Sequence, residues 1–306
     1  GNRPVHTLVW RRQLPAWSPV TVGALAAGAS ASSKGESHGA ALAARVRGDY
    51  GAPGVTLTGS GTGALALAML AAASDGRRAR VAMPAWGCSD LMTAADIVDA
   101  EVILYDLDPA TLAPAPVSFA GALAQQPTAV VVAHWFGLPV LLEPLRAAAH
   151  DAGAVLIEDA AQGVGGTIGE TPLGALGDFG VLSFNRGKGR TGGCGGALLA
   201  NNANAAAMLE RVAHRVAPAT PGKRGLIGLA AQWALGRPSV YAIPASIPFL
   251  KLGETVYHPP SPIRAMPEWA AAVVGALWAR SARESTIRHG VGARWDPIVG
   301  IGNPFA

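Results

Sequence analysis

The stretch AVLIEDAAQGVGG, residues 154–166, joins an apolar run to two carboxylates and a glycine-rich turn. A short apolar run bounded by turn residues predicts a strand that is buried on both faces of a sheet. Asp159 comes directly after this run, and a carboxylate placed there must find a partner or take up a proton. Asp159 therefore either caps the segment that follows it or is a functional group that meets residues from elsewhere in the chain.

Similar apolar runs recur through most of the sequence, separated by alanine-rich stretches. Strands are predicted at residues 54–59, 80–85, 100–106, 128–135, 154–160, 180–184 and 195–201. The spacing of apolar residues predicts helices at 62–74, 141–153 and 205–216. This alternation is typical of an α/β fold with a mostly parallel central sheet flanked by helices, in which ligands bind at the carboxyl ends of the strands.

The alternation ends near residue 237. The segment from Pro238 to Pro267 is rich in proline and predicts a linker into a last helix at residues 268–284. We therefore expect an N-terminal arm and a large α/β domain in residues 1–237. Residues 238–306 are expected to hold the linker and a short, reduced C-terminal domain.

Composition indicates a globular protein and gives no sign of a nucleic-acid partner. The chain has 306 residues, of which 50% are hydrophobic and 14% charged, enough for a sizeable core. The net charge of +4 is small and the basic residues are scattered, so nucleic-acid binding is not expected. Cys88 and Cys194 have no metal-ligand spacing, so neither a disulfide framework nor a metal site is predicted, and a reducing cytoplasm is expected.

Neither export nor a membrane span is expected. Arg11 and Arg12 precede an apolar stretch, as in a twin-arginine export signal, but prolines interrupt that stretch. The most apolar window, GLIGLAAQWALG at residues 225–236, is about 12 residues long and too short to span a bilayer. It predicts a buried or surface-lying helix.

A second stretch, SFNRGKGRTGGCGG at residues 183–196, places a single lysine among glycines. Such a lysine can hold phosphate in a P-loop or act as a nucleophile toward a carbonyl group. A P-loop has the pattern G-x-x-x-x-G-K-[ST]. This chain has Leu182 in place of the first glycine of that pattern and Gly189 in place of the hydroxyl residue after the lysine. The sequence therefore favours Lys188 as a nucleophile.

The residue types that pyridoxal phosphate requires are all present. That cofactor takes a lysine for a Schiff base, a carboxylate for its ring nitrogen, and hydroxyls with backbone N–H groups for its phosphate. Lys188, Asp159 and Ser183 supply the first three. GSGTGAL, residues 59–65, opens a predicted helix whose positive end suits a phosphate dianion, although by itself such a glycine cluster is more often only a turn.

Taken together, these segments resemble the DegT/DnrJ/EryC1/StrS sugar aminotransferases, a family of fold-type I pyridoxal phosphate dependent enzymes. The resemblance runs from about residue 19 to residue 202. It is carried by the ordered motifs SGTGALALAML, PAWGCSDLMTAADIVDAEVILYDLDPATL, VVVAHWFGLP, VLIEDAAQGVGG, PLGALGDFGVLSF and GKGRTGGCGG. Several motifs in the same order are far more specific than any one of them.

The resemblance implies a role for each matching residue. Lys188 forms the Schiff base with pyridoxal phosphate and later moves a proton, while Asp159 pairs with the pyridine nitrogen. Gln162 is expected to lie against the ring near its 3'-oxygen. Ser183 and the turn Gly61-Thr62-Gly63 are expected to hold the phosphate.

The resemblance also implies a reaction. An amino donor, usually glutamate, leaves its nitrogen on the cofactor, and a nucleotide-linked keto-sugar then receives it, as in polysaccharide or secondary-metabolite synthesis. A homodimer is expected, because active sites of this fold lie at a two-fold interface. Two alternatives remain: dehydration or another elimination on a sugar, and a cofactor-binding protein without turnover that serves a regulatory or scaffold role. Lys188 favours transamination over dehydration, because family members that dehydrate sugars replace this lysine.

The sequence departs from the family pattern at several positions. Members commonly have an aromatic residue where this chain has Cys88, so Trp86 is expected to stack on the cofactor ring or else to be an ordinary buried tryptophan. Cys194 replaces an acidic residue after the lysine. His134 is expected close to the cofactor or, alternatively, as a satisfied core residue. The resemblance fades after Asn202, and the asparagine and arginine segment through which a partner subunit completes the phosphate site is not recognisable.

Overall fold

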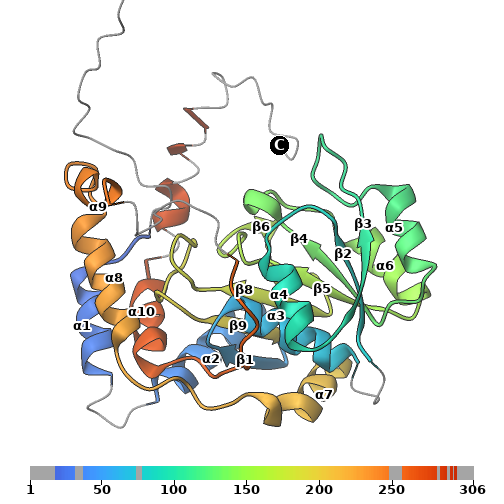
Figure 1. Ribbon diagram of the computed structural model, residues 1–306, viewed down its shortest axis with the longest axis horizontal. Coiled ribbons are helices and arrows are strands. Elements are labelled where there is room, and N and C mark those ends of the chain that lie inside the picture. Colours follow the sequence, from blue (N-terminus) through green and yellow to red (C-terminus); the bar gives the residue numbers. More distant parts are fainter. Residues whose placement is uncertain are drawn as a thin grey trace, which may run out of the picture.

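A seven-stranded sheet forms the centre of the molecule (Figure 1). The computed structural model describes residues 18–31, 37–73, 78–247, 257–280, 283–287, 290–291 and 293–294. The sheet has the order β1-β9-β8-β5-β4-β2-β3. Its strands are β1 (Gly54–Thr58), β2 (Arg80–Pro84), β3 (Glu101–Tyr105), β4 (Ala129–Ala133), β5 (Val155–Asp159), β8 (Phe179–Ser183) and β9 (Gly196–Ala200). Each predicted strand is confirmed with ends that shift by at most one or two residues.

The sheet is mostly parallel, as predicted. β2 pairs in parallel with β3 and β4, β4 with β5, and β5 with β8. β9 is antiparallel to both of its neighbours, β8 and β1, so every strand except β9 runs in one direction. The carboxyl ends of these strands therefore meet at a single edge of the sheet.

Helices cover both faces of the sheet. The α-helices are α1 (Val22–Ser30), α2 (His38–Tyr50), α3 (Gly61–Ala72), α4 (Asp90–Ile97), α5 (Pro116–Leu123), α6 (Glu143–Asp151), α7 (Ala203–Val212), α8 (Arg224–Leu235), α9 (Ala242–Ala245) and α10 (Glu268–Trp278). Short 3-10 turns lie at Trp135–Gly137 (η1) and Ala213–Arg215 (η2), and β6 (Thr167–Ile168) pairs with β7 (Thr171–Pro172) in a small hairpin. Helices α3, α6, α7 and α10 match predicted helices. Helix α8 lies where a buried or surface-lying helix was predicted, at 225–236, and only Leu226 and Leu229 in it are buried.

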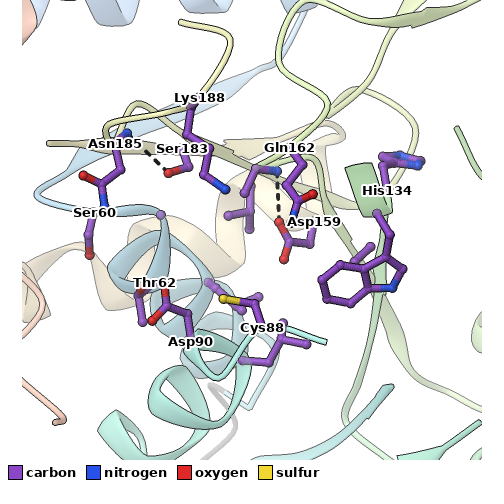
Figure 2. A pocket seen from close by; sticks show the side chains of 17 residues that line it. Ser60, Thr62, Cys88, Asp90, His134, Asp159, Gln162, Ser183, Asn185 and Lys188 are labelled. Atoms are coloured by element: carbon purple, nitrogen blue, oxygen red, sulfur yellow. Dashed lines mark hydrogen bonds between the residues drawn. The ribbon is translucent and has the colours of Figure 1, made fainter. Parts of the chain in front are cut away.

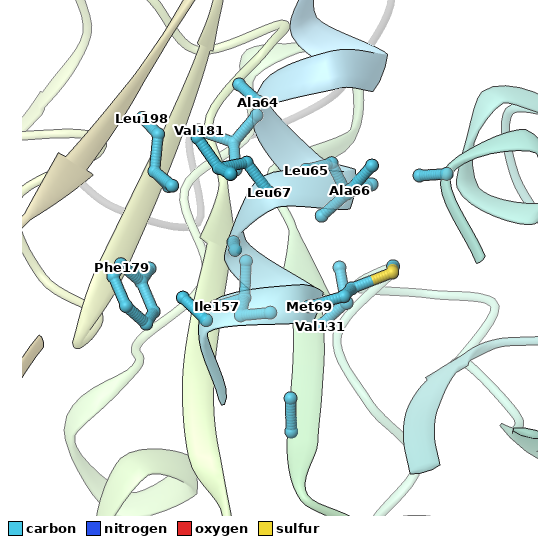
Figure 3. Packing of buried hydrophobic residues seen from close by; sticks show 14 of the residues in the cluster. Ala64, Leu65, Ala66, Leu67, Met69, Val131, Ile157, Phe179, Val181 and Leu198 are labelled. Atoms are coloured by element: carbon cyan, nitrogen blue, oxygen red, sulfur yellow. The ribbon is translucent and has the colours of Figure 1, made fainter. Parts of the chain in front are cut away.

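Successive residues of each strand point to opposite faces, which divides the core into layers. Val131 of β4 packs with α3, α4 and α7, whereas its neighbours Val130 and Val132 pack with α5 and α6. Helix α3 is apolar on nearly all sides and lies against the sheet (Figure 3). The burial of both faces explains why these strands are continuous apolar runs instead of alternating ones.

The C-terminal helix α10 belongs to the main body of the molecule. It shares a hydrophobic core with α1, α2 and α8, and Trp278 donates a hydrogen bond from its indole nitrogen to Asp49 of α2. Helix α10, which lies within 238–306, is therefore packed against the predicted large domain, and a boundary at residue 237 stays a prediction. The N-terminal arm before residue 18 lies outside the described residues. No helix in the described part of the chain has the length and apolar character needed to cross a bilayer.

Candidate active site

A cavity opens at the edge where the parallel strands end (Figure 2). It is lined by Ser60, Gly61, Thr62, Leu65, Cys88, Asp90, Leu91, Ala133, His134, Trp135, Asp159, Ala161, Gln162, Val181, Ser183, Asn185 and Lys188. Of the site residues predicted from the sequence, all but Gly63 and Trp86 line it. Asp90, Asn185 and Trp135 also line it and were not predicted.

Asp159 ends strand β5 and turns its carboxylate into the cavity. Its Oδ1 accepts a hydrogen bond from the Ala161 N–H at 3.0 Å, and within the described residues no hydrogen bond reaches its second oxygen. Burial raises the pKa of this carboxyl group, an effect that the Ala161 N–H and the charge of Lys188 oppose. If Asp159 capped a helix, a helix would follow it, but a turn follows instead. The second carboxylate oxygen is therefore left for a partner in the cavity.

Lys188 reaches the same cavity from the loop between β8 and β9. Its backbone N–H donates to the Asn185 carbonyl at 3.3 Å, and the preceding Gly187 has a φ of +80°, a conformation that favours glycine. The Gly187 N–H donates to Ser18 Oγ at 2.9 Å, which ties the loop to the segment before α1. In the described part of the chain, the Lys188 amine makes no hydrogen bond or ion pair, and Figure 2 shows it pointing toward the space in front of Asp159.

The N-terminus of α3 forms another wall of the cavity, beside the end of β5 and the loop that carries Lys188. Ser60 caps this helix, because its Oγ accepts from the Gly63 N–H at 3.0 Å. Gly63 is thus engaged in the cap, which corrects its predicted place in the site. Gly61 lies so close to Ser183 that a Cβ at position 61 would come within 2.8 Å of the Ser183 Cβ. This close approach brings the hydroxyls of Ser183 and Thr62 to the positive end of the helix dipole, an arrangement suited to a phosphate group.

Gln162 is held by the loop that follows β4. The Phe136 N–H donates to the Gln162 Oε1 at 2.7 Å, so the orientation of the side-chain amide is set. Phe136 has a φ of +57°, which is uncommon for a residue other than glycine. Its side chain is 71% exposed, while the neighbouring Trp135 is 4% exposed and faces inward.

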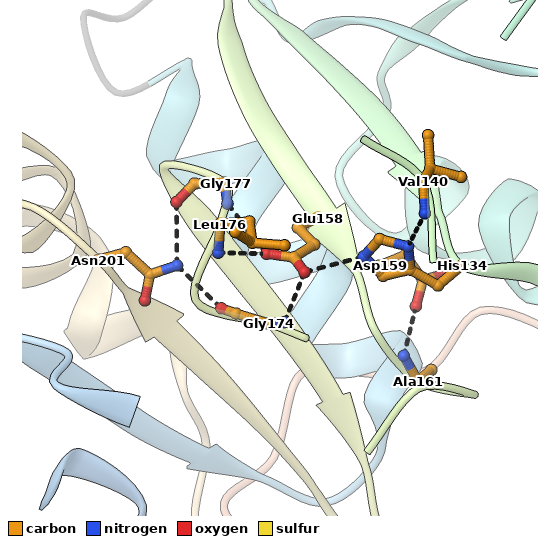
Figure 4. A network of polar contacts seen from close by, with 9 residues as sticks. All are labelled: His134, Val140, Glu158, Asp159, Ala161, Gly174, Leu176, Gly177 and Asn201. Carbon is orange, nitrogen blue, oxygen red and sulfur yellow. Dashed lines mark hydrogen bonds and ion pairs between the residues drawn. The ribbon is translucent and has the colours of Figure 1, made fainter. Parts of the chain in front are cut away.

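His134 is a satisfied core residue, which was the alternative to a cofactor contact. Its Nε2 lies 2.9 Å from the Glu158 Oε1, and its Nδ1 accepts from the Val140 N–H at 3.0 Å (Figure 4). The acceptor role of Nδ1 places the ring proton on Nε2, which donates it to Glu158. Because both ring nitrogens have protein partners and the side chain is fully buried, neither nitrogen is available to a ligand.

Trp86 lies outside the cavity, which corrects its prediction as the residue that stacks on the cofactor. It is 54% exposed and packs edge-on against Trp135, with ring centroids 5.7 Å apart. Cys88 and Trp135 line the cavity in its place. The sequence held a signal for Trp135, since it is the last residue of the strand predicted at 128–135.

The cavity offers groups that suit an organic phosphate cofactor. No cluster of three or more His, Cys, Asp or Glu side chains within the described residues is placed to hold a metal ion. A lysine amine, a buried carboxylate and a helix N-terminus with two hydroxyls converge instead. A mostly parallel sheet that presents these groups at the carboxyl ends of its strands defines the fold-type I class of pyridoxal phosphate dependent transferases.

Comparison with known proteins gives the family within that class. The sequence profile of the DegT/DnrJ/EryC1/StrS aminotransferase family matches residues 30–218, and the chain belongs to this family.

Among curated relatives, the L-glutamine:2-deoxy-scyllo-inosose aminotransferase of Streptoalloteichus tenebrarius is 37% identical over 175 residues, which are 55% of this chain and 41% of that protein. The UDP-N-acetyl-3-dehydro-alpha-D-glucosamine 3-aminotransferase of Acidithiobacillus ferrooxidans is 32% identical over 147 residues, 48% of this chain and 40% of that protein. The chain thus matches about two fifths of the length of these relatives. The solved sugar aminotransferase CalS13 from Micromonospora echinospora shares the fold with a TM-score of 0.67 and 22% identity, over 89% of this chain and 69% of that one.

Proposed function

We propose that this chain is a pyridoxal phosphate dependent aminotransferase that acts on a cyclic polyhydroxy ketone. The observation that carries the proposal is the convergence of Lys188 and Asp159 on one cavity, Asp159 from the end of strand β5 and Lys188 from the loop between β8 and β9. The amine is without a partner in the described residues, and the carboxylate has one oxygen to spare. These are the two side chains that such a cofactor needs for its carbonyl carbon and its ring nitrogen.

The other walls fit the same cofactor. Thr62, Ser183 and the backbone at the start of α3 would hold its phosphate, since they gather at the positive end of a helix dipole. Gln162 lines the cavity beside Asp159 with its amide oxygen already bound by Phe136, so its NH2 group is directed by that contact. Each predicted cofactor contact other than Gly63, Trp86 and His134 keeps its proposed role.

Each side chain has a separate task in the proposed reaction. When bound, pyridoxal phosphate supplies an electron sink for the carbon whose nitrogen is exchanged. The negative charge of Asp159 holds a proton on the ring nitrogen, in a buried place where that charge acts strongly. The Lys188 amine would hold the cofactor covalently and, when free, would take up and return a proton at the substrate carbon.

The names of the relatives support the substrate class. The relative from S. tenebrarius acts on an inosose with L-glutamine, and the relative from A. ferrooxidans acts on a UDP-linked keto-sugar. We infer that the donor of this chain is L-glutamine or L-glutamate, and that the acceptor is a keto-cyclitol or a nucleotide-linked keto-sugar. Both acceptors present a ketone in a ring of hydroxyl groups.

We also propose a homodimer in the cytoplasm. Phe136, Leu138 and Leu141 are exposed apolar residues on the segment that follows β4, next to the cavity, and a second copy of the chain would cover them. The two described cysteines, Cys88 and Cys194, are both free thiols, which suits a reducing compartment.

The first experiment tests the cofactor linkage. Purified protein is loaded with pyridoxal phosphate, treated with borohydride and digested, and the modified peptide is located by mass spectrometry. We expect the cofactor on Lys188 in the wild type and none in Lys188→Ala. Lys223→Ala is the matched control, because that lysine donates to the Ala29 carbonyl and lies outside the cavity. A wild-type protein that retains no cofactor after borohydride contradicts the proposal.

The second experiment tests amino transfer. The loaded protein is mixed with L-glutamine or L-glutamate, and the cofactor spectrum and the keto-acid product are followed. Candidate keto-cyclitols and nucleotide-linked keto-sugars are then added, and the aminated product is identified by mass. A protein that binds the cofactor on Lys188 but exchanges no nitrogen with either donor would support the scaffold alternative.

A further inference from the structure

We propose that Trp135 is the aromatic side chain that contacts the ring of the cofactor, and that Gly87 is the residue that makes room for it. This inference rests on the proposed function in one respect only, the use of a pyridoxal-type ring in the cavity. It assigns a cofactor contact to a residue of the loop after β4, where the sequence pattern predicted one on the loop after β2.

The first argument is the composition of the cavity wall. Among the described residues that line the cavity, Trp135 is the only Phe, Tyr or Trp. Cys88 also lines the cavity but has no ring, and Trp86 lies outside. An electron-poor pyridine ring with a protonated nitrogen gains from contact with an indole, through both apolar burial and interaction with the π-system.

The second argument is the fit between Trp135 and Gly87. A Cβ at position 87 would come within 2.2 Å of the Cη2 atom of the Trp135 ring and within 2.5 Å of its Cζ2. No real Cβ occupies such a position, so the indole fills the space that any other side chain at position 87 would take. Gly87 also has a φ of +153°, which a residue with a Cβ rarely adopts. The absence of a side chain at position 87 and the presence of an indole at position 135 therefore depend on each other.

The third argument is that the position of Trp135 is fixed before any ligand arrives. The preceding residue, His134, is bound through both ring nitrogens and donates its N–H to the Asp159 carbonyl at 3.0 Å. The following residue, Phe136, donates its N–H to Gln162. The Trp135 indole N–H is buried and has no acceptor in the described residues, so the close fit against Gly87, and not a hydrogen bond, holds the ring.

The test uses 4-deoxypyridoxine 5'-phosphate, an analogue that has the ring and the phosphate but no carbonyl group. Its dissociation constant is measured by isothermal titration calorimetry for the wild type, Trp135→Leu and Trp86→Leu. We expect about a tenfold weaker binding in Trp135→Leu, because the aromatic contact is lost, and little change in Trp86→Leu, the matched control next to it. Adding Cys88→Trp to Trp135→Leu should recover most of the affinity, since it returns an indole to the cavity from the other loop.

Several results would overturn the inference. These are equal affinities of the wild type and Trp135→Leu, an equally large loss in Trp86→Leu, or no binding of the analogue to the wild type. If circular dichroism shows that Trp135→Leu does not fold, Trp135→Met and Trp135→Phe replace it. Methionine should then weaken binding about tenfold and phenylalanine much less, and equal affinities for the two would contradict the contact.

The analogue separates this inference from the proposed function. It cannot bond covalently to Lys188, so its affinity reports on the cavity walls alone. A failure of borohydride to fix pyridoxal phosphate would remove the proposed role of Lys188 and leave the measurement at Trp135 valid. A loss of the Trp135 effect would leave the role of Lys188 standing.

Discussion

Glu158 and Asp159 are adjacent carboxylates on one strand, yet they lie in opposite environments. Glu158 is fully buried and accepts hydrogen bonds from the N–H groups of Gly174, Leu176 and Gly177, at 2.5 to 2.9 Å, and from His134 (Figure 4). Asp159 points into the cavity and accepts only from the Ala161 N–H within the described residues.

The difference separates a structural carboxylate from a functional one. Successive residues of a strand face opposite sides, so Glu158 lies on the α5 and α6 side with Leu156, and Asp159 lies on the α3 side with Ile157. A carboxylate surrounded by four donors stabilises the fold and has no capacity left for a ligand. A buried carboxylate with one hydrogen-bond donor has lost its hydration and regained only one interaction. A cationic partner in the cavity would supply the stabilisation that is missing.

The largest effect is expected from Glu158→Gln. The new amide would place an NH2 group against backbone N–H donors, so at least one buried group would lose its partner, and the free energy of unfolding should fall by about 3 to 5 kcal/mol. Urea unfolding followed by circular dichroism measures this. The control is Glu143→Gln, where the side chain is 80% exposed and the change should be far smaller. Equal losses in the two variants would remove the structural role of Glu158.

Asp159→Asn should affect the rate of the reaction instead of the stability of the fold. Stability is expected to change little, and borohydride should still fix the cofactor to Lys188. The rate of amino transfer should fall about 100-fold or more, because a neutral amide cannot hold the proton on the ring nitrogen. Single-turnover absorption with the amino donor measures the rate. A variant with nearly wild-type rates would show that Asp159 does not act on the reaction.

His134→Asn is expected to lower the stability of the fold, as Glu158→Gln does, and to leave cofactor binding largely unchanged. It removes the acceptor of the Val140 N–H and one donor to Glu158, which should cost about 2 kcal/mol of stability. The affinity for 4-deoxypyridoxine 5'-phosphate should change much less than in Trp135→Leu. A large loss of affinity with unchanged stability would restore the cofactor contact that the sequence pattern predicted for this histidine.

The smallest effect is the pH dependence of stability that Asp159 contributes in the absence of cofactor. Burial raises the pKa of its carboxyl group above the unfolded value of about 3.9, so the folded state binds more protons in that interval. Stability therefore falls as pH rises from the unfolded pKa through the folded one, and Asp159→Asn should lack this component. Urea unfolding of both proteins from about pH 4 to 7 gives the difference, and parallel curves would contradict the shift.

The central parts of the fold and site follow from the sequence. Apolar runs of strand length marked every strand of the main sheet, and the residues at or shortly after their carboxyl ends included Asp159, Ser183 and Lys188. Helices α1, α2, α4, α5 and the short α9 were not predicted. Three of them have little contrast between an apolar and a polar face, because alanine and glycine are frequent in them. Their stability comes from tertiary packing, of α1 on α10, of α2 on α10 and β1, and of α5 on β3.

The structure places Trp86 and Gly63 away from the predicted site and settles the alternative left open at His134, and these outcomes have one physical cause. A sequence pattern gives the order of residues at a strand end but not the direction of each side chain after the strand has stopped. His134 follows Ala133 of β4 and faces Glu158, the Ser60 hydroxyl engages Gly63, and the turn at Phe136 directs Trp135 inward.

The sequence alone determined the class of fold, the lysine and the carboxylate, because strand burial and residue chemistry are local properties. Only the tertiary structure decided that the adjacent Glu158 is bound by backbone N–H groups away from the cavity, and which tryptophan lines the cavity. Those outcomes depend on which face of the sheet α3 covers and on the space that Gly87 leaves beside Trp135. Both are contacts between segments far apart in the chain, and no local pattern specifies them.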